Sequence, residues 1–442
     1  MKVPKWLLPV VNLVVLGVLV TSCAAPTATP SAPAAVPNTG STQSGASSKP
    51  ITIVVSSGGF GDNMQVGVDM YRKEHPGQVV NFVVIPHDSL RDKMVTDLST
   101  HSGSVDCVPI EAPAWMPDLY QFLVPLQPYI DKTANFNMDD LLPQNIGPDR
   151  YPYPDGQVYA IPVRQGVDIL HYRKDVFDAA GLQPPATFED VITVGQKLKK
   201  PGSYPFTMHL KQGVYLTQAF LQVLYGMGGS VLNKDLTKAE LGPTAVQATQ
   251  WMVDAIYKYQ IISPNDLNSQ VEDVFTKIQK GDADFAFLSS ANIVPLNPDV
   301  AAKGGVLAYA SLPHSPNVPG NGGEYWSFSF GINKDSQNKD GCWDLINYLA
   351  STPTQVQMAV QTGNGPSRAS VFTDATYQKS SAAAAATLAG MKYGRPVDPH
   401  AKWDQISDIL AAQVSLALTQ KKTSQQAIDD ATKQINTLIG AQ

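Results

Sequence analysis

The sixty residues that follow position 50 alternate between short β-branched runs and segments with helical spacing. Three runs are strand-like, Ile51–Val55, Gln78–Ile85 and Val105–Ile110. Between them, apolar residues recur at helical spacing, first around Val68 and then around Met94. This order of strand, helix, strand, helix and strand predicts a parallel sheet with right-handed crossovers. The chain is therefore expected to belong to the α/β class.

A parallel sheet also predicts where a ligand would bind, because ligands of such sheets lie beyond the carboxyl ends of the strands. The loops after the three strands are Ser56–Asp62, Pro86–Ser89 and Glu111–Trp115, and we expect them to meet at one edge. The side chains in these loops that could line a binding site are Phe60, Asp62, His87, Asp88, Glu111 and Trp115.

The rest of the chain continues the mixture of strands and helices. Strand patterns fall at 157–163, 284–288, 306–311 and 327–332. Helical patterns fall at 186–200, 214–226, 243–259, 271–280 and 339–350. Two amphipathic helices close the chain, one from Trp403 and one that begins with a capping box from Thr423 to Gln426. No internal repeat is apparent, so the pattern does not indicate a solenoid.

Cysteine and histidine positions give no metal motif. The seven histidines show neither HxxxH nor HExxH spacing, and CxxC is absent, so we expect no metal and no cofactor. Cys107 lies in a strand-like run and Cys342 in a helical one. A disulfide between them is allowed in an oxidising compartment, but buried free thiols are common, and we expect the two thiols to be unpaired.

The first 22 residues have the order of a secretion signal. Lys2 and Lys5 precede a mostly apolar run, Trp6–Val20, and small residues lead to Cys23. The cysteine at the cut site resembles a bacterial lipobox, which implies cleavage before Cys23 and a lipid on its sulfur. A plain signal peptide or a membrane anchor is the alternative, but this run is short of the ~20 residues that span a bilayer.

The mature chain would be acidic. Removal of residues 1–22 takes two lysines and no acid, which leaves 30 basic and 38 acidic side chains, a net charge of −8. This sign does not favour nucleic acid as a partner. Residues 24–50 contain five prolines, no aromatic residue and one charge. Such a composition does not bury enough apolar surface to fold, so we expect 23–50 to be a lipidated cysteine followed by a disordered tether.

Five later segments resemble one family. They are DGQVYAIP at 155–162, LHYRKDVF at 170–177, PPATFED at 184–190, GINKDS at 331–336 and TGNGPSR at 362–368. In this order and behind a lipobox, they resemble the extracellular solute-binding proteins of bacterial ABC transporters, in the branch of maltose-binding protein and other sugar binders. The likeness runs from about residue 50 to the C-terminus.

The resemblance implies a periplasmic-binding-protein fold, with two discontinuous α/β lobes, a hinge and an interlobe cleft. By that pattern one lobe holds 51–163 and 329–385, and the other holds 164–328 and 386–442. It implies a monomer, outside the cytoplasm and anchored to the membrane through Cys23, that delivers a small solute to the permease of an ABC transporter. It also implies that the regions of Arg164 and Gln212 border the solute.

A sugar has apolar C–H faces and a rim of hydroxyls, so its site needs flat aromatic rings and polar side chains. Trp115 and Trp326 are the first choices for stacking, although each could be a core aromatic. Tyr325, Phe60 and Trp403 are further candidates. Glu111 and Asp62 are candidate hydroxyl acceptors, as is Asp88, which could instead cap a helix. Ser289-Ser290-Ala291-Asn292 departs from the Trp or Asp usual in the family, which leaves the identity of the solute open.

Two other functions stay open on the residues alone. One is a binding protein for a charged small molecule, such as a phosphate ester, carboxylate or polyamine; Arg164, Lys211 and Arg368 could then cluster around an anion. The other is a surface glycoside hydrolase with Glu111 and Asp88 or Asp62 as paired acids. The chain shows no GxSxG, HExxH or P-loop. We therefore expect a binding protein and not an enzyme.

Overall fold

In the computed structural model of this chain, residues 49–291, 293 and 296–441 are described. The lipobox, Cys23 and most of the expected tether lie outside the described residues. Strands and helices alternate, and the strands form two larger sheets and one two-stranded sheet. The α/β class predicted from the sequence is confirmed.

The first sheet has six strands. They are β1 (Ile51–Ser56), β2 (Val80–Ile85), β3 (Cys107–Ala112), β6 (Ala160–Gly166), β11 (Glu324–Ile332) and β12 (Arg395–Pro396). Strand β1 pairs in parallel with both β2 and β3, as the sequence predicts. Strand β11 is antiparallel to β3 and β6 and pairs in parallel with β12. The carboxyl ends of β1, β2, β3 and β6 therefore lie along one edge.

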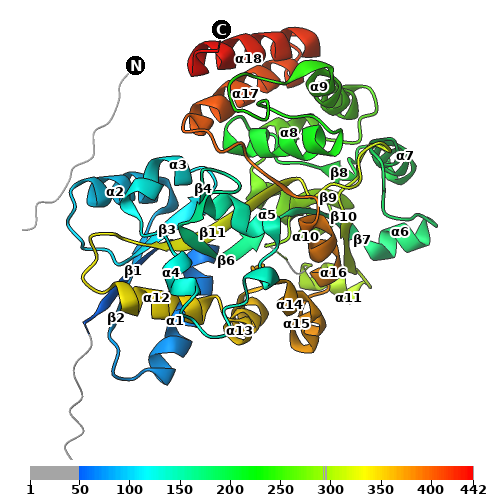
Figure 1. The fold of residues 1–442 in the computed structure, drawn as a ribbon. Coiled ribbons are helices and arrows are strands. Elements are labelled where there is room, and N and C mark those ends of the chain that lie inside the picture. The colour runs from blue at the N-terminus through cyan, green and yellow to red at the C-terminus, as the bar shows by residue number, and fades with distance from the viewer. Residues whose placement is uncertain (1–48, 292, 294–295, 442) are drawn as a thin grey trace, which may run out of the picture. The chain divides into compact units, whose positions relative to one another are not determined.

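Helices cover both faces of this sheet (Figure 1). On one face, α1 (Gly59–Glu74) and α12 (Lys339–Leu349) pack on Ile53 and Val55. On the other face, α2 (His87–Ser99) and α3 (Met116–Leu119) pack on Val54. Successive strand residues point to opposite faces, so an apolar run such as Ile51–Val55 is buried on both sides.

The second sheet has the order β10-β7-β9-β8. Its strands are β7 (Asp168–Arg173), β8 (Phe206–Thr207), β9 (Phe285–Ser289) and β10 (Leu307–Ser311). One face, with Phe206 and Phe285, joins a large core built from α7 (Phe188–Leu198), α8 (Val214–Gly226), α9 (Gly242–Tyr257), α17 (Trp403–Leu418) and α18 (Ser424–Ile439). Helix α10 (Val271–Lys280) packs on the opposite face at Ala286 and Leu288. The predicted Thr423–Gln426 capping box opens α18.

The chain passes between the two sheets on short connections. Only Val167 separates β6 of the first sheet from β7 of the second. Strand β11 begins at Glu324, after a loop that follows β10 of the second sheet, and continues into the first. The sequence placed Tyr325 and Trp326 at the end of a loop, but both lie within β11 because β12 and β6 extend the pairing to their positions.

The remaining elements are short or lie at the edges of the two sheets. Strands β4 (Arg150–Tyr151) and β5 (Gln157–Val158) form a small hairpin. The other helices are α4 (Gln127–Ile130), α5 (Pro143–Ile146), α6 (Lys174–Ala179), α11 (Pro298–Ala302), α13 (Thr352–Thr362), α14 (Ala369–Thr373), α15 (Ala375–Ser380) and α16 (Ala384–Met391). Within the described residues, no helix combines the length and the hydropathy that a membrane span requires.

The expectation of two free thiols was wrong, because Cys107 and Cys342 form a disulfide. Their Cα atoms lie 5.6 Å apart, within the range that a disulfide spans. Cys107 begins β3, and Cys342 lies in the first turns of α12, which packs against the same sheet. The pairing follows from this tertiary contact between residues 235 positions apart, which local patterns do not report.

Candidate functional site

The three loops at the carboxyl ends of β1, β2 and β3 meet, as the parallel topology predicts. His87 Nε2 lies 3.1 Å from Glu111 Oε2, which joins the second and third loops. The Phe60 ring of the first loop stacks on Phe328 with centroids 4.5 Å apart, and the His87 ring meets the edge of Phe328 at 6.3 Å. Phe328 of β11 therefore lies among all three loops.

Arg164, near the end of β6, is buried beside these loops and held in one geometry. Its guanidinium carbon lies 4.8 Å from the centre of the Trp326 ring. Arg164 Nε and Nη2 both donate to Asn364 Oδ1, at 2.9 Å and 2.6 Å, and Asn364 Nδ2 donates to Gly59 O at 3.3 Å. Burial lowers the pKa of Arg164 to about 10, which leaves it protonated at neutral pH. We call Arg164, Asn364, Trp326 and Gly59 the arginine cluster.

The Trp326 indole lies flat against β6 because the residue opposite it is glycine. Trp326 and Gly166 are register partners, and a Cβ built on Gly166 would lie 2.4 Å from the indole. The ring keeps partial exposure to solvent. Of the five predicted aromatic contacts, Trp326 is the one that is not buried.

The other four predicted aromatic side chains are buried. Trp115 is 6% exposed in the core that also holds α2, and Trp403 is 6% exposed in the core of α8, α9 and α17. Phe60 packs on Phe328, and Tyr325 donates its hydroxyl hydrogen to Gln165 Oε1 at 2.9 Å. The position of Trp115 fits the core role that the sequence left as its alternative.

The predicted polar contacts are distributed unevenly. Glu111 is half-buried beside His87, and Asp62 is exposed in the first turn of α1. Both carboxylates act electrostatically on Arg164, where they oppose the effect of burial on its pKa. Gln212 is exposed in the turn before α8. Asp88 lies in α2, and its side chain is outside the described residues.

The cluster of three cations that an anionic solute would need does not form. Arg368 is 4% exposed, its Nη1 donates to Asn137 O at 2.7 Å, and its guanidinium lies over the Phe136 ring. Lys211 is exposed in the turn before α8, with its backbone N–H donating to Ser269 O. Only Arg164 of the three belongs to the arginine cluster.

Two acidic side chains, which the sequence did not single out, lie where the chain passes between the sheets. Asp168 begins β7 and Glu324 begins β11, and the Glu324 backbone N–H donates to Asp168 Oδ2 at 3.2 Å. Burial raises the pKa of Asp168 to about 7. Burial, together with the negative charges of Asp168 and Glu111, raises the pKa of Glu324 to about 8. Neither position carries a sequence signal beyond its place two residues after Gly166 or directly before Tyr325.

A third acid lies after β12, beside a buried tyrosine of α8. The guanidinium of Arg395 lies 4.3 Å from the centre of the Tyr225 ring, and its Nη1 and Nη2 donate to Gly229 O and Ser230 Oγ. Asp398 accepts a hydrogen bond from Leu232 N at 2.8 Å, and burial raises its pKa to about 6. We call Asp168, Glu324, Asp398 and Tyr225 the acidic cluster.

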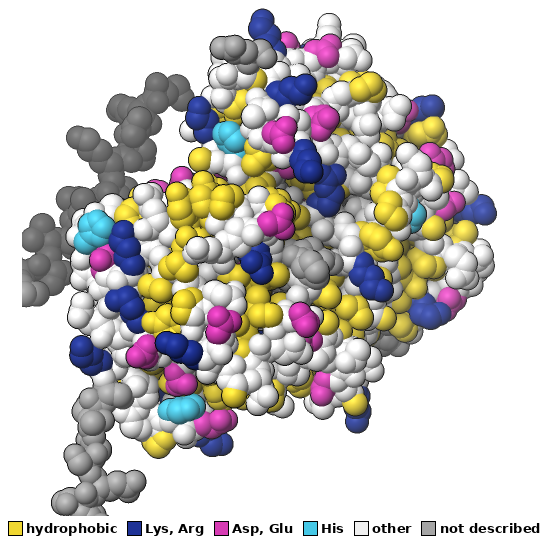
Figure 2. Space-filling model, viewed as in Figure 1, with side chains coloured by type: hydrophobic (Ala, Val, Ile, Leu, Met, Phe, Trp, Pro, Cys, Tyr) yellow, Lys and Arg dark blue, Asp and Glu magenta, His cyan; other side chains and the backbone are white. Residues whose placement is uncertain are grey.

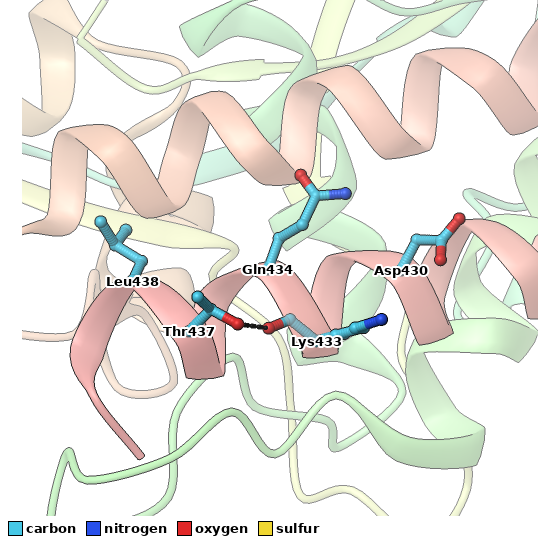
Figure 3. Close-up of a pocket in the computed structure, with 5 residues that line it drawn as sticks. All are labelled: Asp430, Lys433, Gln434, Thr437 and Leu438. Atoms are coloured by element: carbon cyan, nitrogen blue, oxygen red, sulfur yellow. Dashed lines mark hydrogen bonds between the residues drawn. The ribbon is translucent and has the colours of Figure 1, made fainter.

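Two hollows on the surface lie elsewhere. One runs along α18 and is lined by Asp430, Lys433, Gln434, Thr437 and Leu438 (Figure 3). Its one dashed contact is the ordinary helical bond from Thr437 Oγ1 to Lys433 O. A second hollow lies between α9 and the turn before α18. Both are open to solvent and lined by parts of the helical surface, so we place the site at the strand ends.

Two broader features limit the chemistry of the chain. In the part of the chain that the structure describes, no group of three or more His, Cys, Asp or Glu side chains is arranged to hold a metal ion. On the face drawn in Figure 2, acidic and basic side chains are scattered among uncharged ones and do not gather into a patch of one sign. Such a face does not resemble a surface for a polyanion.

Comparison with known proteins identifies the family. The profile of the bacterial extracellular solute-binding proteins matches residues 56–356. A probable amino-acid ABC transporter periplasmic-binding protein of Sinorhizobium fredii is 22% identical over 370 residues, 81% of this chain and 82% of that protein. An sn-glycerol-3-phosphate-binding periplasmic protein of Brucella abortus is 26% identical over 344 residues, 72% of this chain and 76% of that protein.

A solved structure shows the same fold. Maltose-bound MalE3 of T. maritima superposes with a TM-score of 0.75 at 24% identity, over 88% of this chain and 99% of that one. The two sheets connected by β6–β7 and β11 are thus the two α/β lobes of a periplasmic-binding-protein fold. The chain belongs to family 1 of the bacterial extracellular solute-binding proteins, which serve ABC transporters.

Proposed function

We propose that the protein captures a sugar or oligosaccharide in the interlobe cleft and delivers it to the permease of an ABC transporter. The partly exposed indole of Trp326, packed closely against Gly166 beside the fixed charge of Arg164, is the observation that carries this proposal. An indole face suits the C–H face of a sugar ring. Glu111 and Asp62, next to Arg164, supply hydroxyl acceptors.

The proposed lobes are 51–163 with 329–385 and 164–328 with 386–442, and a solute is trapped because only the closed form contacts it from both sides. A swing from 1:99 to 99:1 in favour of the closed form requires about 5.5 kcal/mol of differential affinity. X-ray scattering should show a more compact protein at saturating solute, and identical profiles would contradict the trap.

The names of relatives do not decide the solute, because they point to an amino acid, a glycerol phosphate and maltose. The geometry speaks against an anion. Asp168 and Glu111 act on Glu324, two residues before Trp326, whereas Arg368 donates to the backbone carbonyls of Ala350 and Asn137. Among the described residues, these carboxylates are not paired in the way that a glycoside hydrolase requires. The family is also one of transport proteins, so we propose no enzymatic activity.

We also propose that the protein is exported, anchored by a lipid on Cys23 and monomeric. The Cys107–Cys342 disulfide supports an oxidising compartment outside the cytoplasm. In the native host, wild-type protein should fractionate with the membrane, and Cys23→Ala should move to the soluble fraction or stay unprocessed. Recovery of Cys23→Ala in the membrane as processed protein would contradict the anchor.

The function is tested by screening melting temperature against mono-, di- and oligosaccharides, polyols, amino acids and phosphate esters. A solute that binds only the folded protein raises stability by RT ln(1 + [L]/Kd), about 2.7 kcal/mol at one hundred times Kd. We expect a saturable rise with a member of the carbohydrate sets. A rise only with amino acids or phosphate esters would contradict the carbohydrate assignment while leaving solute binding in place.

A further inference from the structure

The carboxylates of the acidic cluster lack cationic partners. Among the described residues, neither Asp168, Glu324 nor Asp398 forms a salt bridge, although other acids of similar burial do, such as Asp266 with Lys277 and Asp140 with Arg368. Asp168 and Glu324 face each other, and Glu111 acts on Glu324 from the first sheet. Asp398 faces Glu240 and Arg395. Only Asp398 has a cation, Arg395, acting on it; among the described residues no cation acts on Asp168 or Glu324, so their ionised forms would be uncompensated.

The two nearest arginines are already committed to other partners. Arg395 uses Nη1 and Nη2 on Gly229 O and Ser230 Oγ, and its planar face on the Tyr225 ring. Arg164 uses Nε and Nη2 on Asn364 and its planar face on Trp326. Neither guanidinium can swing toward Asp168 or Glu324 without breaking hydrogen bonds that it makes now.

A second, independent observation points to a ligand at the same place. Tyr225 is 3% exposed, and among the described residues its hydroxyl oxygen has no hydrogen-bond partner. The charged groups that act on this hydroxyl are Asp398, Arg395 and Glu324, with Tyr153 beside them. A buried polar group is normally paired, so an unpaired hydroxyl among uncompensated carboxylates indicates a place where a donor from outside is missing.

We propose that the solute carries a protonated amine on its polyhydroxylated frame, and that this amine binds to the acidic cluster while the frame stacks on Trp326. This inference rests on the proposed function and names the chemical class of the solute. An ammonium offers three N–H donors and no acceptor, whereas ionised carboxylates only accept. A neutral hydroxyl would not compensate the ionised carboxylates and would leave the carboxyls protonated, and an anion would disfavour their ionisation further.

The test uses three disaccharides with the same β-1,4 frame, which differ only at the second carbon of each ring. They are the glucosamine disaccharide with free amines, its N-acetylated form and cellobiose. Titration calorimetry at pH 6, in buffers of different ionisation enthalpy, reports both affinity and proton release. We expect the free amine to bind at least about tenfold more tightly than cellobiose, equal to about 1.4 kcal/mol.

Proton release separates this inference from ordinary sugar binding. At pH 6 the raised pKa values of Asp168 and Glu324 mean that these carboxyls are largely protonated in the free protein. An ammonium favours the ionised form and so expels protons. The amine should therefore release protons on binding and lose affinity in high salt, whereas cellobiose should do neither.

Three variants and one control locate the effect. Glu324→Gln and Asp168→Asn should each lower the preference for the amine about tenfold, and neither should weaken the binding of cellobiose. Tyr225→Phe should also lower the preference for the amine, while it keeps the aromatic ring in place. Asp282→Asn, at an exposed acid before β9, should match wild type. Should Glu324→Gln fail to fold, Tyr225→Phe provides the same comparison with the smallest structural change.

The outcomes distinguish this inference from the proposed function. Equal or tighter binding of cellobiose, or a preference for the amine that survives in Glu324→Gln, Asp168→Asn and Tyr225→Phe alike, overturns the amine assignment and leaves a sugar-binding protein. Absence of binding by all three disaccharides overturns the amine assignment on this frame, and the wider melting screen then decides the proposed function separately.

Discussion

The arginine cluster and the acidic cluster differ in how completely their polar groups are paired. In the first, Arg164, Asn364 and Gly59 satisfy one another, and the indole of Trp326 rests on Gly166. In the second, the Tyr225 hydroxyl has no hydrogen-bond partner, and the three carboxyl groups form no salt bridge among the described residues. A paired network fixes the geometry of its side chains before a ligand arrives. Unpaired buried groups lower the stability of the free protein but can still form hydrogen bonds with a ligand. The first cluster therefore acts as the scaffold, and the second sets selectivity.

The largest effect should come from breaking the scaffold. Arg164→Ala leaves the Asn364 oxygen unpaired and removes the contact with Trp326, so we expect a loss of about 3 kcal/mol in the free energy of unfolding, together with loss of solute binding. Urea unfolding and calorimetry measure both. Lys93→Ala, which breaks an exposed pair with Asp97, is the control and should cost less than about 1 kcal/mol.

The second effect concerns pH and belongs to the acidic cluster. The pKa of Asp168 is raised in the folded state, so this group stabilises the fold at low pH, and its contribution is lost as pH rises from about 4 to about 7. Asp168→Asn should remove a slope of up to about 1.4 kcal/mol per pH unit in that window. The measurement is the difference in unfolding free energy between wild type and variant.

Taking that difference cancels the opposite trend of two buried histidines. Burial lowers the pKa of His171 to about 3 and of His209 to about 4, so both favour the fold as pH rises toward 6.5. They are present in wild type and variant alike. A difference that stays constant from pH 4 to pH 7 would show that Asp168 is not held protonated by its surroundings.

An intermediate effect should follow from pushing the indole off the strand. Gly166→Ala places a methyl group where the Trp326 ring now lies, and overpacking of this kind costs about 1–3 kcal/mol. Solute affinity should fall more than stability does, because the stacking face moves. Tryptophan fluorescence and titration report the two separately, and unchanged affinity would mean that the solute does not contact Trp326.

The smallest effect on the free protein should come from Tyr225→Phe. The hydroxyl has no partner to lose, so the free energy of unfolding should stay within about 0.5 kcal/mol of wild type or rise slightly. Chemical unfolding without solute is the measurement. A loss above about 1 kcal/mol would mean that the hydroxyl already makes a stabilising bond, which would remove the reason to assign it to a ligand.

The sequence predicted what depends on local pattern. The parallel order of β1, β2 and β3 followed from apolar runs and helical spacing, and it placed His87 beside Glu111 correctly. Capping at Thr423 was equally local. The sequence did not predict strand β7. Its stretch Asp168–Arg173 is half polar, and it becomes a strand through pairing with its neighbours in the second sheet.

What the sequence missed depends on contacts between distant segments. The disulfide joins positions 235 apart, and Asn364 meets Arg164 across 200 residues. The raised pKa values of Asp168 and Glu324 arise from burial where two strands pass between the sheets, which no spacing rule reports. Trp115 has the same loop position as a cleft residue but is buried by α2 and α3, so loop placement alone does not distinguish a platform from a core aromatic.

The central claim is that a solute stacks on the indole of Trp326, and titration of Trp326→Ala tests it most directly. The control is Trp251→Ala. Trp251 is a partly exposed tryptophan of α9 that packs against Phe188 in the large core beside the second sheet. With the best solute from the melting screen, we predict that Trp326→Ala weakens binding at least about tenfold, while Trp251→Ala loses stability but keeps its affinity. Equal affinities for wild type and Trp326→Ala would contradict the account.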